Sequence, residues 1–418
     1  MLIEYIQNNI IQNKNISMCI FNNHQNNQVK YDIYNRVLFY NINCDSIHNC
    51  FILDFINCNC IETIDVNGSC YNIEKLIYDK MPMLKNIYIY FNKIYSNIEI
   101  KNLFSFDGIN VNIKKLKLFK SNITSLIDID KTPNLEEICI TISKIKEINY
   151  LKTLTKLTSV ELSSSQISVI KGLKKLTNLT YLNLSHNKIK NINGLDNLKN
   201  LIELNLSYNK IKKIEGLNNL TNLKRLILSI NRIKIIEGLD NLSNLIYLDL
   251  SNNKIKNIEG FDNLFQLKSL ILSYNKIINI EELNNLENLE TLHLSYNRIN
   301  KIKRLNKLSK LKFLLLDNNK IKNINGLCCL INLIAVNLDN NKIKKIKKLH
   351  SLANLETVYL KNNHLSFYSP IIELLKLPKM QYLYYSNFKK NKKIYFDSYF
   401  NIYYEMQKKM CEFNNLIN

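Results

Sequence analysis

The sequence predicts a fold of the α/β class, a solenoid whose coils stack to form one parallel β-sheet. The first observation is a period: LxxLxLxxNxI returns every 22 residues in twelve frames, from the frame that starts at Ile113 to the frame that starts at Leu355, without insertion. Such a period is typical of solenoids. The second is spacing, because positions 4 and 6 are apolar and face the same side of a strand. The third is that one frame cannot bury that side alone, so frames must stack.

The part of each frame after the strand is too short for a long helix. It keeps apolar residues at positions 14, 17 and 20, as in Ile214, Leu217 and Leu220. We expect short turns and pieces of 3₁₀-helix on the side opposite the sheet. Glycine at position 16 fits a turn that needs a permissive backbone. This glycine is present at Gly172, Gly194, Gly216, Gly238, Gly260 and Gly326.

Position 9 lies in the wall of the core and is polar in every frame. It is Ser at Ser121, Ser143 and Ser165, and Asn in the nine frames that follow. Because a buried amide needs hydrogen-bond partners, we expect these side chains to bond the loop backbones of their own and neighbouring coils. This predicted structural Asn ladder consists of Asn187, Asn209, Asn231, Asn253, Asn275, Asn297, Asn319, Asn341 and Asn363.

The pattern divides the chain into four regions. Residues 1–36 are expected to form an N-terminal cap or a partly disordered segment, and residues 37–112 hold degenerate repeats with an insertion. Residues 113–365 form the twelve regular repeats. Residues 366–418 are expected to form a C-terminal cap followed by an aromatic and basic helix. Caps are needed because an open last coil would expose its apolar face.

These repeats resemble the leucine-rich-repeat family. The 22-residue length and the second half of the repeat, IxxIxGLxxLxxL, are similar to the subtype found in protein phosphatase 1 regulatory subunit 7. The resemblance implies a right-handed horseshoe with the sheet on its concave face, turns and 3₁₀-helices on its convex face, and capped ends. It also implies a non-enzymatic scaffold or regulatory subunit, with a protein phosphatase 1 type catalytic subunit as a partner.

Positions 2, 3, 5, 7 and 8 face outward from the predicted sheet and are free to vary. From the frame at Leu135 onward they hold nine acidic residues and five basic ones, with aromatic and His side chains among them. Because aromatics are enriched at interfaces, we expect a protein partner on the concave face. The predicted partner-contacting residues are Glu161, Tyr181, His186, Glu203, Tyr208, Tyr247, Asp249, Tyr274, His293, Tyr296, Phe313, Asp317, Asp339 and Tyr359.

A row of cations lies just beyond the predicted strands. Position 10 is Lys or Arg in nine of the twelve frames and position 12 is Lys in seven, in a chain with a formal net charge of +22. Nucleic acid across the concave face is disfavoured, because it would meet the acidic residues there. RNA or an anionic surface bound by this lysine rim is one alternative function. A ciliary or cytoskeletal adaptor is another, and localisation would separate it from the scaffold that binds a protein on its concave face.

The sequence offers no catalytic constellation. Its six His are scattered, and it has no phosphate-binding loop, zinc-protease motif or nucleophile elbow. We therefore predict no enzyme activity, no cofactor and no metal. No signal peptide and no membrane-spanning segment are expected. The predicted protein is a monomer of the cytoplasm, the nucleus or both.

One cysteine cluster leaves three interpretations open: reduced thiols, metal ligands or disulfides. Without an expected export signal, reduced thiols are favoured. Zinc would require four ligands in tetrahedral reach. The cluster consists of Cys44, Cys50, Cys58, Cys60 and Cys70, with His48 among them.

Overall fold

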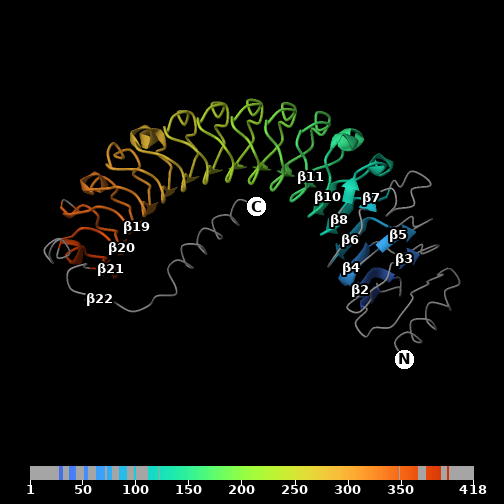
Figure 1. The fold of residues 1–418 in the computed structure, drawn as a ribbon, viewed down its shortest axis with the longest axis horizontal. Coiled ribbons are helices and arrows are strands. Elements are labelled where there is room, and N and C mark those ends of the chain that lie inside the picture. The colour runs from blue at the N-terminus through green and yellow to red at the C-terminus, as the bar shows by residue number, and fades with distance from the viewer. Residues whose placement is uncertain are drawn as a thin grey trace. The chain divides into compact units, whose positions relative to one another are not determined.

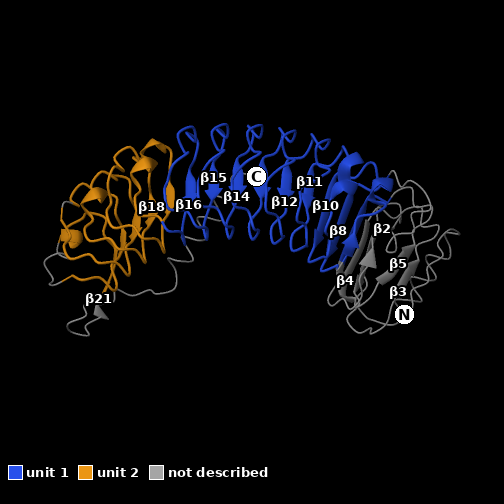
Figure 2. Cartoon of the chain, turned by 45° about the horizontal axis from the view of Figure 1, so that its top comes forward, with its two compact units in different colours: residues 1–276 blue, residues 277–418 orange. Residues whose placement is uncertain are grey.

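The computed structural model divides the chain into two units, which are described separately below. Unit 1 is Met1–Lys276 and unit 2 is Ile277–Asn418 (Figure 2). The residues that the structure describes are 28–31, 37–43, 51–54, 63–70, 73–77, 84–91, 98–99, 112–121, 123–347, 349–365, 373–386 and 393–394.

Unit 1 is a solenoid segment with a parallel sheet, in which β8 pairs with β10 and every later strand pairs with the next through β16 (Figure 1). From β10 onward each register step is one 22-residue repeat, as in Glu137 opposite Ser159. The strands are β1 (Gln28–Tyr31), β2 (Val37–Asn43), β3 (Phe51–Asp54), β4 (Thr63–Cys70), β5 (Ile73–Ile77), β6 (Asn86–Phe91), β7 (Ile98–Glu99), β8 (Lys115–Phe119), β9 (Ile123–Ser125), β10 (Glu137–Thr141), β11 (Ser159–Glu161), β12 (Tyr181–Asn183), β13 (Glu203–Asn205), β14 (Arg225–Ile227), β15 (Tyr247–Asp249) and β16 (Ser269–Ile271).

The degenerate repeats continue the same sheet upstream. β2 pairs with β4, β4 with β6 and β6 with β8, all in parallel. In the last pair Asn86 lies opposite Lys115, a step longer than one repeat, which places the insertion between these two strands. β1 lies antiparallel to β2, and its residues fall within the segment predicted as an N-terminal cap. Cys44, Cys50, Cys58 and Cys60 lie outside the described residues, as does His48.

Unit 2 is also a parallel solenoid segment. β17, β18, β19, β20 and β21 pair in chain order, and β22 lies antiparallel to β21. The predicted C-terminal cap therefore includes a strand of this sheet, and the rest of 366–418 outside 373–386 and 393–394 is not described. The strands are β17 (Thr291–His293), β18 (Phe313–Leu315), β19 (Ala335–Asn337), β20 (Thr357–Tyr359), β21 (Tyr382–Ser386) and β22 (Lys393–Ile394).

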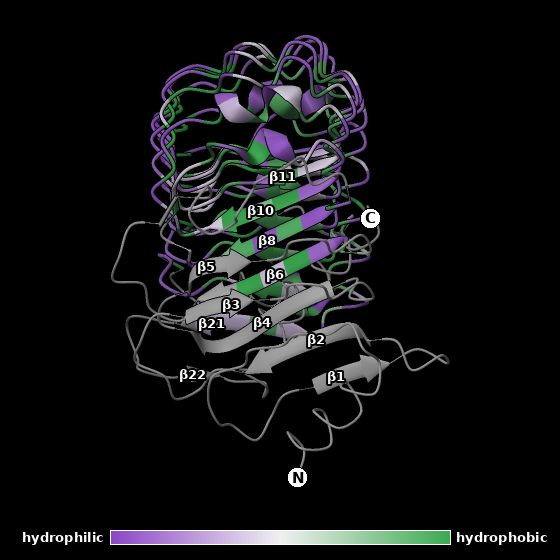
Figure 3. Cartoon of the chain, turned by 90° about the vertical axis from the view of Figure 1, so that its right-hand side faces the viewer, coloured by the Kyte–Doolittle hydropathy of each residue, from purple (hydrophilic) through white to green (hydrophobic). Residues whose placement is uncertain are grey.

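The predicted apolar positions form the core in both units. In the coil that starts at Leu201, the side chains at positions 1, 4, 6, 11, 14, 17 and 20 are all buried. Figure 3 shows β6, β8 and β10 side by side, with hydrophobic stretches in each. Each coil packs its apolar side chains against those of its neighbours, and their transfer from water drives the stacking.

The side opposite the sheet consists of turns and short 3₁₀-helices, as predicted. Gly172, Gly194, Gly216, Gly238 and Gly260 have positive φ, whereas Gly326 lies within a 3₁₀-helix and does not share it. The 3₁₀-helices are η1 (Ile129–Lys131) and η2 (Asn149–Thr153) in unit 1, and η3 (Glu281–Asn285) and η4 (Asn325–Leu327) in unit 2. The predicted fold class is confirmed.

Candidate functional site

The outward face of the unit 1 sheet, called the sheet face below, is built from positions 3 and 5 of successive coils. Exact register places the same position of each coil side by side, so residues 22 apart in sequence become lateral neighbours. Adjacent parallel strands lie about 4.8 Å apart, so long side chains at these positions reach one another. The face is therefore a continuous array of interacting side chains.

Glu203, Arg225 and Tyr247 form a contact chain across three adjacent strands. Arg225 Nε lies 3.3 Å from Glu203 Oε1. The Arg225 guanidinium carbon lies 4.0 Å from the centroid of the Tyr247 ring, in cation–π contact. Burial raises the pKa of Glu203, and the guanidinium of Arg225 opposes that rise. Glu203 on one side and Tyr247 on the other therefore hold the Arg225 side chain in place without a partner.

Tyr247 and Asp249, both predicted to contact a partner, are held inside this array. Tyr247 is buried, and burial raises the pKa of its hydroxyl above the usual range. Burial also raises the pKa of Asp249, whose Oδ1 accepts the Ser251 N–H at 2.9 Å. The buried ring of Tyr247 therefore packs against the Arg225 guanidinium. This corrects the expectation that Tyr247 is open to contact with a partner.

A second polar cluster surrounds Glu161. The Glu161 carboxylate accepts hydrogen bonds from Ser163 Oγ at 3.2 Å and Asn183 Nδ2 at 3.3 Å. Burial, with Glu161 adding to it, raises the pKa of Tyr181 to about 12 and that of Cys139 to about 12. These groups keep their protons at neutral pH, which opposes a role for the phenol or the thiol as a nucleophile.

The position-8 row is defined here over five successive coils of unit 1. It consists of His186, Tyr208, Ile230, Asn252 and Tyr274. All five have left-handed backbone conformations, with φ between 53° and 57°. His186 and Tyr208 stack with ring centroids 3.8 Å apart and planes at 15°. Tyr208 is 45% exposed and Tyr274 49% exposed. Of the predicted residues, those in this row are the ones most open to solvent in unit 1.

The Asn ladder connects each coil to the one before and the one after. Asn209 Nδ2 donates to the carbonyls of Leu184, Leu206 and Ser207 at 3.0–3.1 Å. Its Oδ1 accepts the Ile189 N–H at 2.9 Å. The Asn209 side chain thus bonds the backbone of its own coil and of the preceding coil. The same arrangement recurs at Asn187, Asn231, Asn253, Asn275, Asn319, Asn341 and Asn363. The geometry is that of a structural group.

Two further Asn rows, which the sequence interpretation missed, lie on the turns. At position 22, Asn222 Nδ2 donates to the Lys199 carbonyl of the preceding coil at 3.0 Å. At position 19, Asn219 Nδ2 donates to the Asp196 carbonyl at 3.0 Å. Asn recurs at positions 19 and 22 of the repeat, so the sequence did contain a pattern that indicates these two rows. Much of the asparagine in the chain thus stabilises the stacking of coils.

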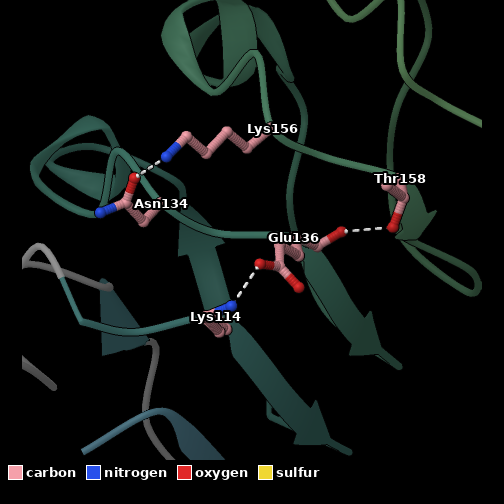
Figure 4. A network of polar contacts seen from close by, with 5 residues as sticks. All are labelled: Lys114, Asn134, Glu136, Lys156 and Thr158. Carbon is pink, nitrogen blue, oxygen red and sulfur yellow. Dashed lines mark hydrogen bonds and ion pairs between the residues drawn. The ribbon is translucent and has the colours of Figure 1, made fainter. Parts of the chain in front are cut away.

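Other contacts between residues 22 apart lie on the surface near the strand starts. Lys114 Nζ lies 2.7 Å from Glu136 Oε1, and Lys156 Nζ donates to Asn134 Oδ1 at 2.5 Å (Figure 4). Thr158 Oγ1 donates to the Glu136 carbonyl at 3.1 Å. Exposed pairs of this kind contribute little to stability, and they tie adjacent coils without forming a binding site.

The sheet face of unit 2 has a different composition. Tyr359 stacks on Tyr384 with centroids 4.5 Å apart, and Ser295 Oγ donates to Asp317 Oδ1 at 2.5 Å. His293, predicted to contact a partner, is instead buried; its Nε2 has no hydrogen-bond partner among the described residues, and burial lowers its pKa to about 4. The predicted residues Phe313, Asp339 and Tyr296 lie at separate places on this unit, with Tyr296 44% exposed.

Replacing Asp339 by Asn should remove a pH dependence of unit 2. Burial, with Asp317 adding to it, raises the pKa of Asp339 to about 6. Because the unfolded state loses this proton first, the carboxylate lowers stability as pH rises from about 4 to about 6. Asn keeps an acceptor for the Lys361 N–H, now at 2.6 Å from Oδ1. We expect Asp339→Asn to stabilise the unit by about 1–3 kcal/mol at pH 7 and by nothing at pH 4.

Hydrogen exchange of unit 2 peptides between pH 4 and pH 7 measures this effect, after correction for the intrinsic exchange rate. Glu373→Gln is the matched control, because its carboxylate is 52% exposed. A pH profile of Asp339→Asn parallel to that of the wild type would contradict the expectation.

The basic rim is defined here for unit 1 by positions 10 and 12 of the coils that hold the position-8 row. It consists of Lys188, Lys190, Lys210, Lys212, Arg232, Lys234, Lys254, Lys256 and Lys276. All are exposed except Lys210, which is half-buried. No ion pair is recorded between these cations and any carboxylate among the described residues. Their coils contain the strands β12 to β16, several of which are labelled in Figure 2.

Arg225 joins the predicted residues as a central part of the candidate site. It was recognised in the sequence as one of five outward-facing bases, but not as a partner-contacting residue. Its signal was available, since Glu203 and Tyr247 occupy the same position one repeat before and one repeat after it.

Within the described residues, no group of three or more His, Cys, Asp or Glu side chains is placed to hold a metal ion. The described part of the chain also contains no helix with the length and apolar character needed to cross a membrane. Cys139, Cys328 and Cys329 are free thiols.

Parts of the chain match family models of leucine-rich repeats. The model described as Leucine Rich repeats (2 copies) matches residues 221–263 and 287–329, and the model described as Leucine rich repeat matches residues 155–211. No curated protein matches the sequence.

Solved structures of other proteins share the fold. An internalin, inlF, from Listeria monocytogenes is 28% identical, with a TM-score of 0.59, over 66% of this chain and 87% of that chain. A leucine-rich-repeat protein of Leptospira interrogans is 22% identical, with a TM-score of 0.58, over 78% and 90% respectively. TLR13, in complex with ssRNA13, is 18% identical, with a TM-score of 0.54, over 85% and 67%. The last two likenesses show the fold alone.

The register, the core and the Asn ladder define a parallel β-solenoid of the repeat class. By these matches the segments 155–211, 221–263 and 287–329 are leucine-rich repeats, and the solved structures show the same fold.

Proposed function

We propose that this protein is a non-enzymatic scaffold that binds a partner protein on the sheet face of unit 1. The observation that carries the proposal is the contact chain of Glu203, Arg225 and Tyr247. Arg is enriched among the residues that dominate binding energy. Because Arg225 is already held between Glu203 and the buried Tyr247 ring, a partner would not need to order it, and the entropic cost of binding is lower.

The ionisable groups on this face suit recognition better than catalysis. Tyr181 and Cys139 hold their protons at neutral pH, and Glu203 is ion-paired. A catalytic site would instead need a nucleophile with an activating base, or an acid and base with pKa values near the working pH. The half-buried polar array fits the polar and aromatic composition of a protein interface.

Ser159→Trp tests the sheet face. Ser159 is half-buried on β11, between Glu137 and Tyr181 in the strand register, so an indole there would block an approaching partner. The chain contains no Trp, so the new indole is also a unique fluorophore. We expect Ser159→Trp to weaken capture of the native partner by at least about tenfold, the equivalent of about 1.4 kcal/mol. Lys175→Trp, at an exposed turn position, is the matched control.

The decisive readout is binding of purified proteins by the two Trp variants. Equal capture by Ser159→Trp and Lys175→Trp would reject the sheet face as the binding surface. A protein phosphatase 1 type catalytic subunit is the first candidate to purify, since it is the partner implied by the resemblance of the repeats to regulatory subunit 7. No binding of that subunit by the wild-type chain would remove the candidate and leave the scaffold proposal to the capture experiment.

A further inference from the structure

The position-8 row of unit 1 contains residues that the backbone does not favour. Ile230 and Tyr208 both have φ of 53°, in the left-handed region. A left-handed conformation suits Gly and Asn, and it is disfavoured for bulky and especially β-branched side chains. Asn252 occupies the equivalent place one coil beyond Ile230 with φ of 53°. The fold therefore accepts Asn at this position, and it does not require Ile or Tyr.

Ile230 is half-buried, but burial does not account for the Tyr side chains of the row. Tyr208 is 45% exposed, Tyr274 is 49% exposed, and Ile142, at position 8 of an earlier coil, is 53% exposed. The left-handed conformation occurs at position 8 of every coil from Lys120 to Asn362, so the repeat fold sets it. Exposed apolar side chains at a position where the backbone favours Asn therefore point to a role in recognition. The row presents aromatic and aliphatic surface where the turn alone would favour Asn.

The basic rim lies directly beside this row. Each residue of the row is followed two positions later by a rim cation, as Tyr208 is followed by Lys210 and Ile230 by Arg232. The rim cations form no recorded ion pair with a carboxylate of the described residues, and Glu203 on the sheet face is paired with Arg225 instead. Ile235, which follows the rim residue Lys234, is 62% exposed.

We propose that the position-8 row and the basic rim of unit 1 together bind an acidic polypeptide segment that also carries apolar side chains. This inference rests on the proposed protein-binding function and names the chemical class of the partner. Carboxylates of the segment contact the rim, and its apolar side chains pack on the row. The proposed protein-binding function favours such a segment; His186, Tyr208 and Tyr274 also offer rings of the kind on which bases stack, so single-stranded nucleic acid is the alternative that the test below separates.

The dimensions of the row suit a short extended segment. Five coils spaced about 4.8 Å apart span about 19 Å between the first and the last. An extended chain rises about 3.3 Å per residue, so about six residues cover the row. Three of them would point toward the surface and three away.

The test measures binding of three defined probes to the full chain by fluorescence anisotropy at about 0.15 M salt. The probes are a random copolymer of glutamate and tyrosine, poly-glutamate of equal length, and poly(U). We expect the copolymer to bind at least about tenfold more tightly than either other probe. The double variant Tyr208→Asn with Ile230→Asn should lose that tenfold advantage and bind poly-glutamate as before. The double variant Lys212→Gln with Lys234→Gln should weaken both acidic probes.

The Asn variants keep the experiment interpretable, because Asn is already present at this position in a neighbouring coil and its backbone preference matches the turn. Equal binding of poly(U) and the copolymer by the wild type would overturn the proposal in favour of nucleic acid. If the Asn double variant binds the copolymer as tightly as the wild type does, the proposal is overturned, because the basic rim would then bind the segment by charge without the row. Either failure is distinct from failure of the scaffold proposal, which Ser159→Trp reports on a different surface.

Discussion

Replacing Asn209 by Ala is expected to lower the free energy of unfolding of its coils by about 1–3 kcal/mol. The Ile189 N–H, which Asn209 Oδ1 accepts at 2.9 Å, would be left buried without an acceptor. An unsatisfied buried group of this kind costs about 1–3 kcal/mol. The carbonyls of Leu184 and Leu206 lose one donor each but keep another, from Asn187 at 3.1 Å and from Asn231 at 2.9 Å. The orphaned N–H therefore dominates the expected loss.

Asn222→Ala is the matched control, because it removes the same side chain from the same repeat. Asn222 is exposed and donates one hydrogen bond, to the Lys199 carbonyl, which water can replace. We expect a change within about 0.5 kcal/mol. Hydrogen exchange resolved by peptide is the right measurement, since a long repeat array need not unfold as one unit. Equal loss of protection in the two variants would contradict the structural role of the ladder.

Replacing Gly216 by Ala is expected to destabilise the adjoining coils by about 2–5 kcal/mol. Gly216 has φ of +71°, and a Cβ there would lie 2.2 Å from the Ile192 carbonyl oxygen of the preceding coil. The left-handed conformation costs a residue with a Cβ about 1–2 kcal/mol. Relieving the overlap by moving the backbone costs about 1–3 kcal/mol more. The contact joins two coils, so both should lose protection.

Glu215→Ala, at the exposed residue next to Gly216, is the control for this substitution. It changes neither the backbone conformation nor the contact with Ile192, and its expected effect is within about 0.5 kcal/mol. Thermal unfolding and hydrogen exchange of the coils at Leu179 and Leu201 measure both variants. A Gly216→Ala protein as stable as Glu215→Ala would mean that the coils can separate here without loss.

Most of the fold could be predicted from the repeat period in the sequence. A fixed step of 22 residues predicts the register directly, and Leu204 lies opposite Leu226 as that step requires. It also identifies the buried positions, because a residue that recurs in phase must occupy the same environment in each coil. The seven-residue insertion upstream was visible for the same reason, as a break in phase between Leu84 and Ile113.

The period could not show how neighbouring side chains on the sheet face interact. Arg225 has Glu203 on one side and Tyr247 on the other, but its contact with both depends on rotamers that the pattern does not specify. The burial of His293 was equally hidden, because position 5 alternates outward like position 3 while its exposure depends on the neighbouring side chains. The left-handed conformation at position 8 was hidden by Ile and Tyr, which normally indicate strand.

The antiparallel strands at the sheet edges have a consequence for the length of the array. Identical parallel coils could add to one another end to end without limit, because each open edge presents the same row of backbone donors and acceptors. In unit 1, β1 runs against β2, and in unit 2, β22 runs against β21, so each edge carries a strand of opposite direction. β1 covers the parallel template at the unit 1 edge, and β22 covers it at Tyr385 and Ser386 of β21. Cutting the chain at a coil boundary would restore that template, and the fragments should polymerise.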